Sequence, residues 1–197
     1  QAERPNIIMF LIDDQNPSSI AAFGGDTYTP NLDRMAQEGM KFTRAYVSSS
    51  VCTPSRYSFL TGRFAGNSHS KLYVDAVGGN ENQGLPNFNV ALERDNMNVG
   101  NVLREAGYTT GFVGKFHLTS NLDFPEFYKG KDKWINIPKN ARPGPETSAQ
   151  FKHNERWMRR YLNELGFSWA KNVYPENMPS PYSTHNPEWT TVAALEF

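Results

Sequence analysis

The feature that most restricts the fold of this chain is an unbroken apolar run close to its start. Residues 5–12 read PNIIMFLI, in which residues 7–12 are all apolar, and polar residues bound these on both sides. An apolar segment of this length without polar alternation is typical of a strand that is buried on both faces. Such strands belong to parallel sheets that are covered by helices. The run therefore predicts a strand over Pro5–Ile12 and an α/β fold.

Further elements alternate along the chain as an α/β sheet requires. Strands are predicted over Lys41–Ser48 and Tyr108–Val113. Apolar residues at helical spacing, with capping signals at their ends, predict helices over residues 30–38, 98–106, 151–165 and from 186 onward. No internal repeat and no linker divides the sequence. Residues 1–197 are therefore expected to belong to one domain.

The remaining segments are predicted to be loops. Residues 64–95 hold many Gly and Asn residues, and residues 121–148 are rich in Pro, Lys and aromatic residues. We expect both to be surface excursions, and we expect residues 172–183 to be a loop with several prolines.

Polar residues that could act in catalysis or metal binding follow each predicted strand. Asp13 and Asp14 come directly after the first strand, Cys52 after the second, and Lys115 and His117 after the third. Ligands of open α/β sheets bind at the carboxyl ends of the strands. The order of elements therefore predicts that these three segments converge at one edge.

The single cysteine of the chain lies in the segment CTPSRYSFLTGR, residues 52–63. Pro54 suits an early position of a helix, which places Cys52 at the helix N-terminus, near free N–H groups and the positive end of the dipole. Arg56 is one turn further and can return to the same side. The alternative is an inert buried cysteine in front of an ordinary helix. Only three residues separate Cys52 from Arg56, which is too few for the phosphate loop of cysteine-dependent phosphatases.

The other two segments also allow a structural and a functional interpretation. Asp13 and Asp14 offer paired carboxylates, which suit a hard divalent cation, but aspartates also cap strand-end turns. Lys115 and His117 are two residues apart, so an extended backbone would point both to one face. The alternative is a surface lysine beside a partly buried histidine.

Composition excludes some classes of function. The formal net charge is zero, so no basic field indicates nucleic-acid binding. No apolar run approaches the roughly 18 to 20 residues that span a membrane.

The chain starts at Gln1 without a methionine and has no glycosylation sequon, since Pro17 blocks the one at Asn16. The start fits either a mature exported protein or a trimmed chain, and the missing sequon argues against a lysosomal glycoprotein. We expect an exported protein, periplasmic or extracellular and of bacterial origin. The last helix reaches Phe197 without a cap, so we expect a piece of a longer protein.

The pattern Cys-x-Pro-Ser-Arg, followed by Thr-Gly-Arg and later by Gly-Lys-x-His, resembles the type I sulfatases of the alkaline phosphatase superfamily. Phe116 stands where that family commonly has Trp, and Thr119 where it commonly has Gly. The resemblance implies a mostly parallel central sheet sandwiched by helices, of which this chain holds the N-terminal portion. It also implies that a maturation enzyme oxidises Cys52 to Cα-formylglycine. One Ca²⁺ ion would be held by Asp13, Asp14 and the modified Cys52.

The resemblance further implies a mechanism for sulfate ester hydrolysis. One oxygen of the hydrated aldehyde at position 52 attacks sulfur, the alcohol leaves, and the covalent sulfo-enzyme collapses to release sulfate. Arg56 would hold the diol, Lys115 would bind a sulfate oxygen or the diol, and His117 would be the base for the collapse. The family also uses later residues at the metal and the sulfate. His153, His185 and Asn186 lack the expected neighbours and are left unassigned.

Two other functions stay open from the sequence. One is a phosphate or phosphonate monoester hydrolase of the same superfamily, and the other is an inactive homologue that acts as a binding protein. A sulfated carbohydrate is the first expected substrate and a simple aryl sulfate the second. Four aromatic residues in the predicted loops could stack on a sugar ring or could be ordinary packing: Tyr73, Phe88, Phe127 and Trp134.

Overall fold

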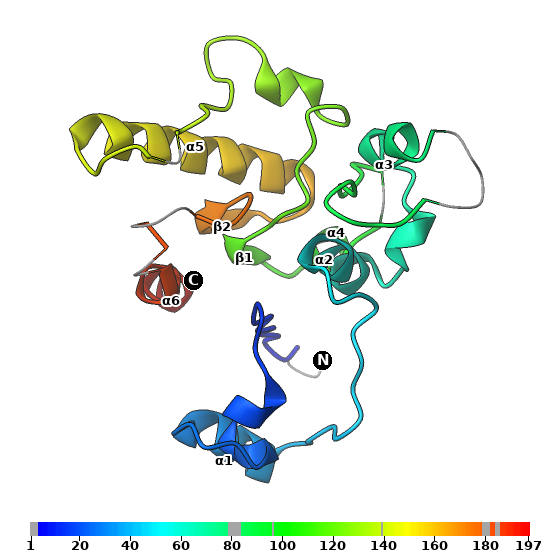
Figure 1. Ribbon diagram of the computed structural model, residues 1–197, viewed down its shortest axis with the longest axis vertical. Coiled ribbons are helices and arrows are strands. Elements are labelled where there is room, and N and C mark those ends of the chain that lie inside the picture. Colours follow the sequence, from blue (N-terminus) through cyan, green and yellow to red (C-terminus); the bar gives the residue numbers. More distant parts are fainter. Residues whose placement is uncertain (1–3, 79–83, 96, 139, 179–181, 184–185) are drawn as a thin grey trace. The chain divides into compact units, whose positions relative to one another are not determined.

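The computed structural model describes residues 4–78, 84–95, 97–138, 140–178, 182–183 and 186–197. The chain divides into two compact units, Gln1–Val47 and Ser48–Phe197. Each unit is described here by itself, and Figure 1 labels its elements.

The first unit is built around helix α1, Pro30–Glu38, which follows two short 3-10 helices, η1 (Pro17–Ser19) and η2 (Ala21–Phe23). The helix begins after Thr29 and ends at Gly39, whose N–H donates to the carbonyl of Met35, as its capping signals predicted. The Asp33 carboxylate accepts hydrogen bonds from the Ala22 N–H at 2.8 Å and from the Thr29 hydroxyl at 3.1 Å. These bonds join η2 to α1.

The two strands predicted nearest the start of the chain do not form. Neither Pro5–Ile12 nor Lys41–Ser48 is a strand among the described residues, and Ile8 and Phe10 are each 76% exposed. A strand needs a hydrogen-bonded neighbour, because a lone strand leaves its N–H and C=O groups unpaired and both faces uncovered. The apolar pattern alone was therefore insufficient, and this prediction was wrong in the structure.

The second unit contains a parallel pair of strands, β1 (Gly111–Lys115) and β2 (Trp169–Tyr174). The predicted strand at Tyr108–Val113 is present but lies further along the chain. β2 was missed, because we expected a loop from residue 172. The register shifts between Val113 and Gly114, where β2 carries one extra residue, Asn172. A parallel pair needs a long crossover, and helix α5 (Pro145–Glu164) supplies it.

Helices lie on both sides of this strand pair, which confirms the α/β class. In Figure 1, α5 and α6 (Asn186–Glu196) lie on opposite sides of β2, and both pack against it. The predicted helix at residues 151–165 is confirmed, although α5 starts earlier, after Gly144. Its apolar stripe is buried as expected, and Gly166 ends it with a φ of 98°.

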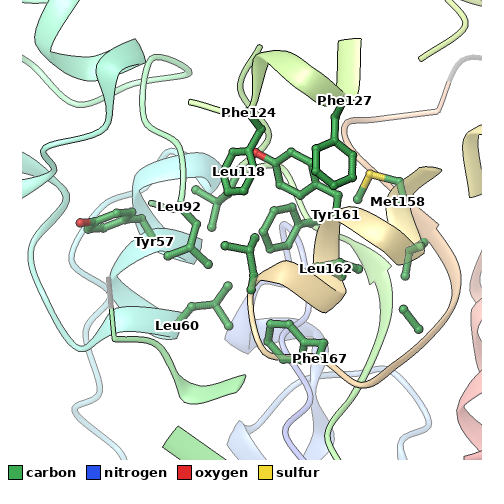
Figure 2. Packing of buried hydrophobic residues seen from close by; sticks show 14 of the residues in the cluster. Tyr57, Leu60, Leu92, Leu118, Phe124, Phe127, Met158, Tyr161, Leu162 and Phe167 are labelled. Atoms are coloured by element: carbon green, nitrogen blue, oxygen red, sulfur yellow. The ribbon is translucent and has the colours of Figure 1, made fainter. Parts of the chain in front are cut away.

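The core of the second unit forms between α5 and two segments that we expected at the surface. Figure 2 shows Tyr161 and Leu162 of α5 packed with Leu92, Phe124 and Phe127. Residues 64–95 carry η3 (Ala65–Asn67) and α3 (Lys71–Ala76), and residues 121–148 carry η4 (Pro125–Tyr128). Both segments bury apolar residues, so the prediction of surface excursions was wrong. Burial depends on distant partners that local composition does not reveal.

Two further helices of this unit lie in contact: α2, Cys52–Thr61, and α4, Val99–Glu105. The predicted start of α4 is confirmed by a capping box, in which Asn98 and Asn101 accept each other's backbone N–H. No helix in the described ranges is long and apolar enough to cross a membrane.

Candidate active site

Helix α2 places Cys52 at its first position. Val51 precedes it with an extended backbone, and the Val51 carbonyl accepts the first intrahelical bond from the Ser55 N–H at 3.1 Å. Thr53 and Pro54 are buried, while Cys52 is half-buried. The prediction that Cys52 begins a helix is confirmed. Its sulfur therefore lies at the positive end of the helix dipole, which favours negative charge.

Arg56 ties α2 to the end of β1. Its side chain is only 8% exposed, and its Nη1 donates to the backbone carbonyl of Lys115 at 2.6 Å. The guanidinium lies one turn beyond Cys52, as the spacing predicted. A buried cation is thereby fixed between the two segments that carry the candidate nucleophile and base.

His117 contacts Cys52 through a backbone conformation that the sequence did not predict. We expected an extended backbone, but His117 has a φ of 60°, in the left-handed region. The cost of such a backbone for a non-glycine residue is about 1–3 kcal/mol, and these residues cluster at functional sites. The resulting turn brings His117 Nδ1 to 3.2 Å from the Cys52 sulfur. The structure thus brings these two predicted site residues together.

Lys115 is the last residue of β1 and is only 7% exposed. Its ammonium donates a hydrogen bond of 2.7 Å to the side-chain oxygen of Asn177. Asn177 lies just beyond the carboxyl end of β2, and sequence reasoning missed it because it missed that strand. Applied to β2, the strand-end rule would have found this residue.

An aromatic ring lies against the histidine. The rings of Phe88 and His117 have centroids 5.4 Å apart and planes tilted by 33°. Phe88 is exposed, whereas Phe116, the neighbour of His117, is fully buried in the core. The imidazole is therefore bounded by Phe88 and by the Cys52 sulfur.

A buried carboxylate, that of Glu93, anchors helix α2. Glu93 accepts hydrogen bonds from the Tyr57 hydroxyl at 3.2 Å, the Ser68 hydroxyl at 2.6 Å and the Ser70 N–H at 3.0 Å. Burial, followed by the adjacent Glu93 carboxylate, raises the pKa of Tyr57 to about 12. Tyr57 therefore stays protonated at neutral pH and donates to Glu93. This network fixes the helix that presents Cys52.

Asp13 and Asp14 belong to the first unit and are exposed there. Asp14 has a φ of 61°, which is uncommon for a non-glycine residue. Their oxygens match the preference of Ca²⁺, but two carboxylates provide only part of its six to eight ligands. Within the described residues, no group of three or more His, Cys, Asp or Glu side chains could hold a metal ion. The approach of these aspartates to Cys52 stays a prediction.

The residues that we left unassigned take other positions. His153 Nε2 lies 2.8 Å from the carbonyl of Lys133, and the Asn186 amide donates to the Tyr174 hydroxyl at 2.6 Å. His185 lies outside the described residues. Neither His153 nor Asn186 makes a described contact with Cys52 or His117.

Comparison with known proteins adds to this geometry. Residues 5–176 match the family model described as Sulfatase. Arylsulfatase G of Rattus norvegicus is 36% identical over 142 residues, which cover 70% of this chain and 24% of that protein. Arylsulfatase G of Homo sapiens is 32% identical over 156 residues, covering 78% of this chain and 27% of that protein. N-acetylgalactosamine-6-sulfatase of Rattus norvegicus is 36% identical over 152 residues, covering 72% of this chain and 26% of that protein.

The chain thus spans about a quarter of the length of these relatives. All three are mammalian proteins, so they give no support to the bacterial origin that we expected.

Proposed function

This chain belongs to the sulfatase family, and we propose that the full-length protein hydrolyses sulfate esters at Cys52. The observation that carries the proposal is the 3.2 Å contact between Cys52 Sγ and His117 Nδ1 at the start of α2. Two buried cations, Arg56 and Lys115, accompany this contact. A candidate nucleophile, a base and two charge-stabilising groups thus come together in one unit.

The nucleophile is proposed to be Cα-formylglycine, which a maturation enzyme forms from Cys52. In that case the Cys52 sulfur marks the place of the oxygens of the hydrated aldehyde. The hydrate would supply the attacking oxygen and, by returning to the aldehyde, would release sulfate without attack of water on sulfur.

The residues around position 52 have distinct roles in this proposal. His117 Nδ1 takes the proton of the hydroxyl group at position 52 when sulfate is released, because it lies within hydrogen-bond reach of that side chain. Lys115 faces a sulfate oxygen with its ammonium, which Asn177 orients. Arg56 offsets negative charge and keeps the end of β1 in place through the Lys115 carbonyl.

A calcium ion is proposed as the cofactor, with Asp13, Asp14 and the modified Cys52 among its ligands. The hard carboxylate oxygens of the two aspartates support this choice. When bound, the ion would polarise the sulfate ester and offset its charge. The other ligands are left unassigned.

A sulfated carbohydrate is the proposed substrate. The protein is also proposed to be exported. The name of one relative, N-acetylgalactosamine-6-sulfatase, refers to a sulfated amino sugar and supports the choice of a carbohydrate. The name arylsulfatase G refers to an aryl sulfate and keeps that class as the second candidate. No residue described above favours a phosphate ester over a sulfate ester.

The test combines mass spectrometry with product analysis on the full-length protein from its native host. We expect the peptide that contains Cys52 to carry the mass of an aldehyde in place of a thiol. We also expect sulfate release, measured by ion chromatography, to disappear in Cys52→Ala. An unmodified thiol together with full activity of Cys52→Ala would refute the proposal. Faster turnover of an aryl phosphate than of the matching aryl sulfate would favour the phosphate hydrolase instead.

A further inference from the structure

We propose that Phe88 forms a stacking subsite for a ring in the leaving alcohol, directly beside His117. The subsite would select sulfate esters in which the ester oxygen is carried by, or next to, a sugar or aryl ring. This inference rests on the proposed function, because it assigns the part of the substrate that leaves.

The structure separates Phe88 from the other aromatic residues that could have served this purpose. Tyr73 and Phe127 are buried in the core, and Trp134 packs against the core with its ring 5.1 Å from that of Trp157. Their faces are used for packing within the protein. Phe88, in contrast, is 63% exposed. It therefore has a ring face available for a ligand.

The position of Phe88 relative to the reacting group supports the same conclusion. Its ring centroid lies 5.4 Å from that of His117, and His117 Nδ1 lies 3.2 Å from the Cys52 sulfur. One side chain thus separates Phe88 from the atom that stands for the nucleophile. A ring attached to a sulfate held at position 52 would be within reach of Phe88.

The backbone that carries Phe88 is held in place on both sides. Before it, the Asn87 N–H donates to the Asn89 side chain at 2.7 Å, which closes a small turn with Phe88 at its tip. After it, Val90 is buried, and the Leu92 N–H donates to the carbonyl of Leu118 at 3.1 Å. Leu118 directly follows His117. The turn is therefore fastened to the segment that bears the candidate base.

The chemistry of the residue fits the leaving group and not the sulfate. A phenyl ring carries no charge, whereas Arg56 and Lys115 supply the positive charge for the anion. An aromatic face binds the apolar face of a sugar or another aromatic ring and contributes little to a short acyclic chain. Phe88 should therefore change the preference among alcohols and leave sulfate recognition intact.

The experiment compares three probes on the full-length protein: 4-methylumbelliferyl sulfate, N-acetylgalactosamine 6-sulfate and the acyclic propyl sulfate. Phe88→Ala should lower kcat/KM by about three- to tenfold on at least one ring-bearing probe, mainly through KM, and by less than twofold on propyl sulfate. The probe that is affected tells whether the ring is aryl or sugar. Phe88→Trp should restore the loss. Leu85→Ala is the matched control, since Leu85 is 80% exposed in the same loop.

Two outcomes would overturn the subsite. An equal loss on all three probes would mean that Phe88 acts only by packing against His117. No loss on either ring-bearing probe would mean that the ring does not contact the leaving group.

If the wild-type protein releases sulfate from none of the three probes, the subsite is judged by binding alone, and the proposed function is judged separately by the modification of Cys52. In the Cys52→Ala background, titrations followed by ligand NMR should then give about three- to tenfold weaker binding of a ring-bearing probe after Phe88→Ala. Unchanged binding of both ring-bearing probes would overturn the subsite independently of catalysis.

Discussion

The two units of the chain differ in what happens to their apolar residues. In the first unit, Ile8 and Phe10 are largely exposed and no strand forms among residues 4–47, although their segment has the most strongly apolar pattern in the sequence. In the second, β1 and β2 pair, α5 packs against β2, and the apolar side chains of α5 are buried in a core (Figure 2). An apolar run therefore becomes a strand only where a second strand satisfies the hydrogen bonds of its backbone.

The same division separates two kinds of support for the candidate site. For Cys52, Arg56, Lys115 and His117, the second unit provides distances and burial. For Asp13 and Asp14, the first unit provides only the chemistry of their side chains. The experiments below test whether both units contribute to one activity, beginning with the largest expected effect.

The strongest test removes the nucleophile in the second unit. Cys52→Ala should lower sulfate release by about 10³-fold or more, because covalent catalysis is lost entirely. Initial rates with an aryl sulfate measure the loss. Ser48→Ala is a suitable control, since Ser48 is exposed shortly before α2 and outside the proposed machinery. Retention of more than a tenth of the activity in Cys52→Ala would assign the chemistry to other residues.

The second test addresses the first unit. Replacing Asp13 and Asp14 together by Asn should remove bound calcium and lower kcat by about 10²-fold, because two anionic ligands become neutral. Calcium content by elemental analysis is measured beside the rate. Asp26→Asn, at another exposed position of the same unit, should retain both. Full calcium content in the double variant would show that Asp13 and Asp14 are not calcium ligands.

A smaller effect is expected at the residue that the sequence did not reveal. Asn177→Ala should lower kcat/KM by about three- to tenfold, because the Lys115 ammonium loses a hydrogen bond of 2.7 Å. Asn177→Gln should recover part of the loss, while Glu176→Ala should have little effect. Lys115→Ala as the background provides a double-mutant cycle. If the effects of Asn177→Ala and Lys115→Ala simply add, the positioning role is wrong.

The smallest effect on activity is expected at the anchor of α2. Tyr57→Phe should reduce the free energy of unfolding by about 1–2 kcal/mol at pH 7, because the buried Glu93 carboxylate loses a donor. Denaturant titration of the full-length protein measures the change. A much larger loss of stability would show that folding of the whole second unit depends on the hydrogen bonds around Glu93.

The pH dependence of the same variant provides a second measurement. The pKa of Tyr57 is raised from 10.0 to about 12, so its contribution to stability is complete below pH 10. Above that pH the unfolded chain ionises first, and this stability is lost as pH rises towards 12. Tyr57→Phe should therefore show a shallower decrease in stability over that range. Parallel curves for both proteins would contradict the assignment.

How well the sequence predicted the fold depended on how local the signal was. Thr29 and Gly39, Asn98, and Gly166 mark helix ends by contacts within a few residues, and all were predicted correctly. β2 could not be recognised, because WAKNVY mixes polar and apolar residues and becomes a strand through its pairing with β1. The burial of Phe124 likewise depends on α5, which follows it by some twenty residues.

The candidate site followed the same rule. The place of Cys52 at a helix start was predicted, because Pro54 and Arg56 signal it locally. The contact with His117 was expected from the order of strands, but the left-handed turn that makes it was not. Asn177 was missed together with β2.

The extra residue in β2 has a consequence for insertions and deletions. Asn172 is the unpaired position, and it holds both neighbouring helices: its N–H donates to Glu155 of α5, and its amide donates to the backbone of α6. Deleting Asn172 would leave Val173 opposite Gly114 and Tyr174 opposite Lys115, as in a regular ladder. It would remove both of these hydrogen bonds to the flanking helices. One extra residue therefore fastens β2 to the helices on either side of it, although it contributes no atom to the chemistry.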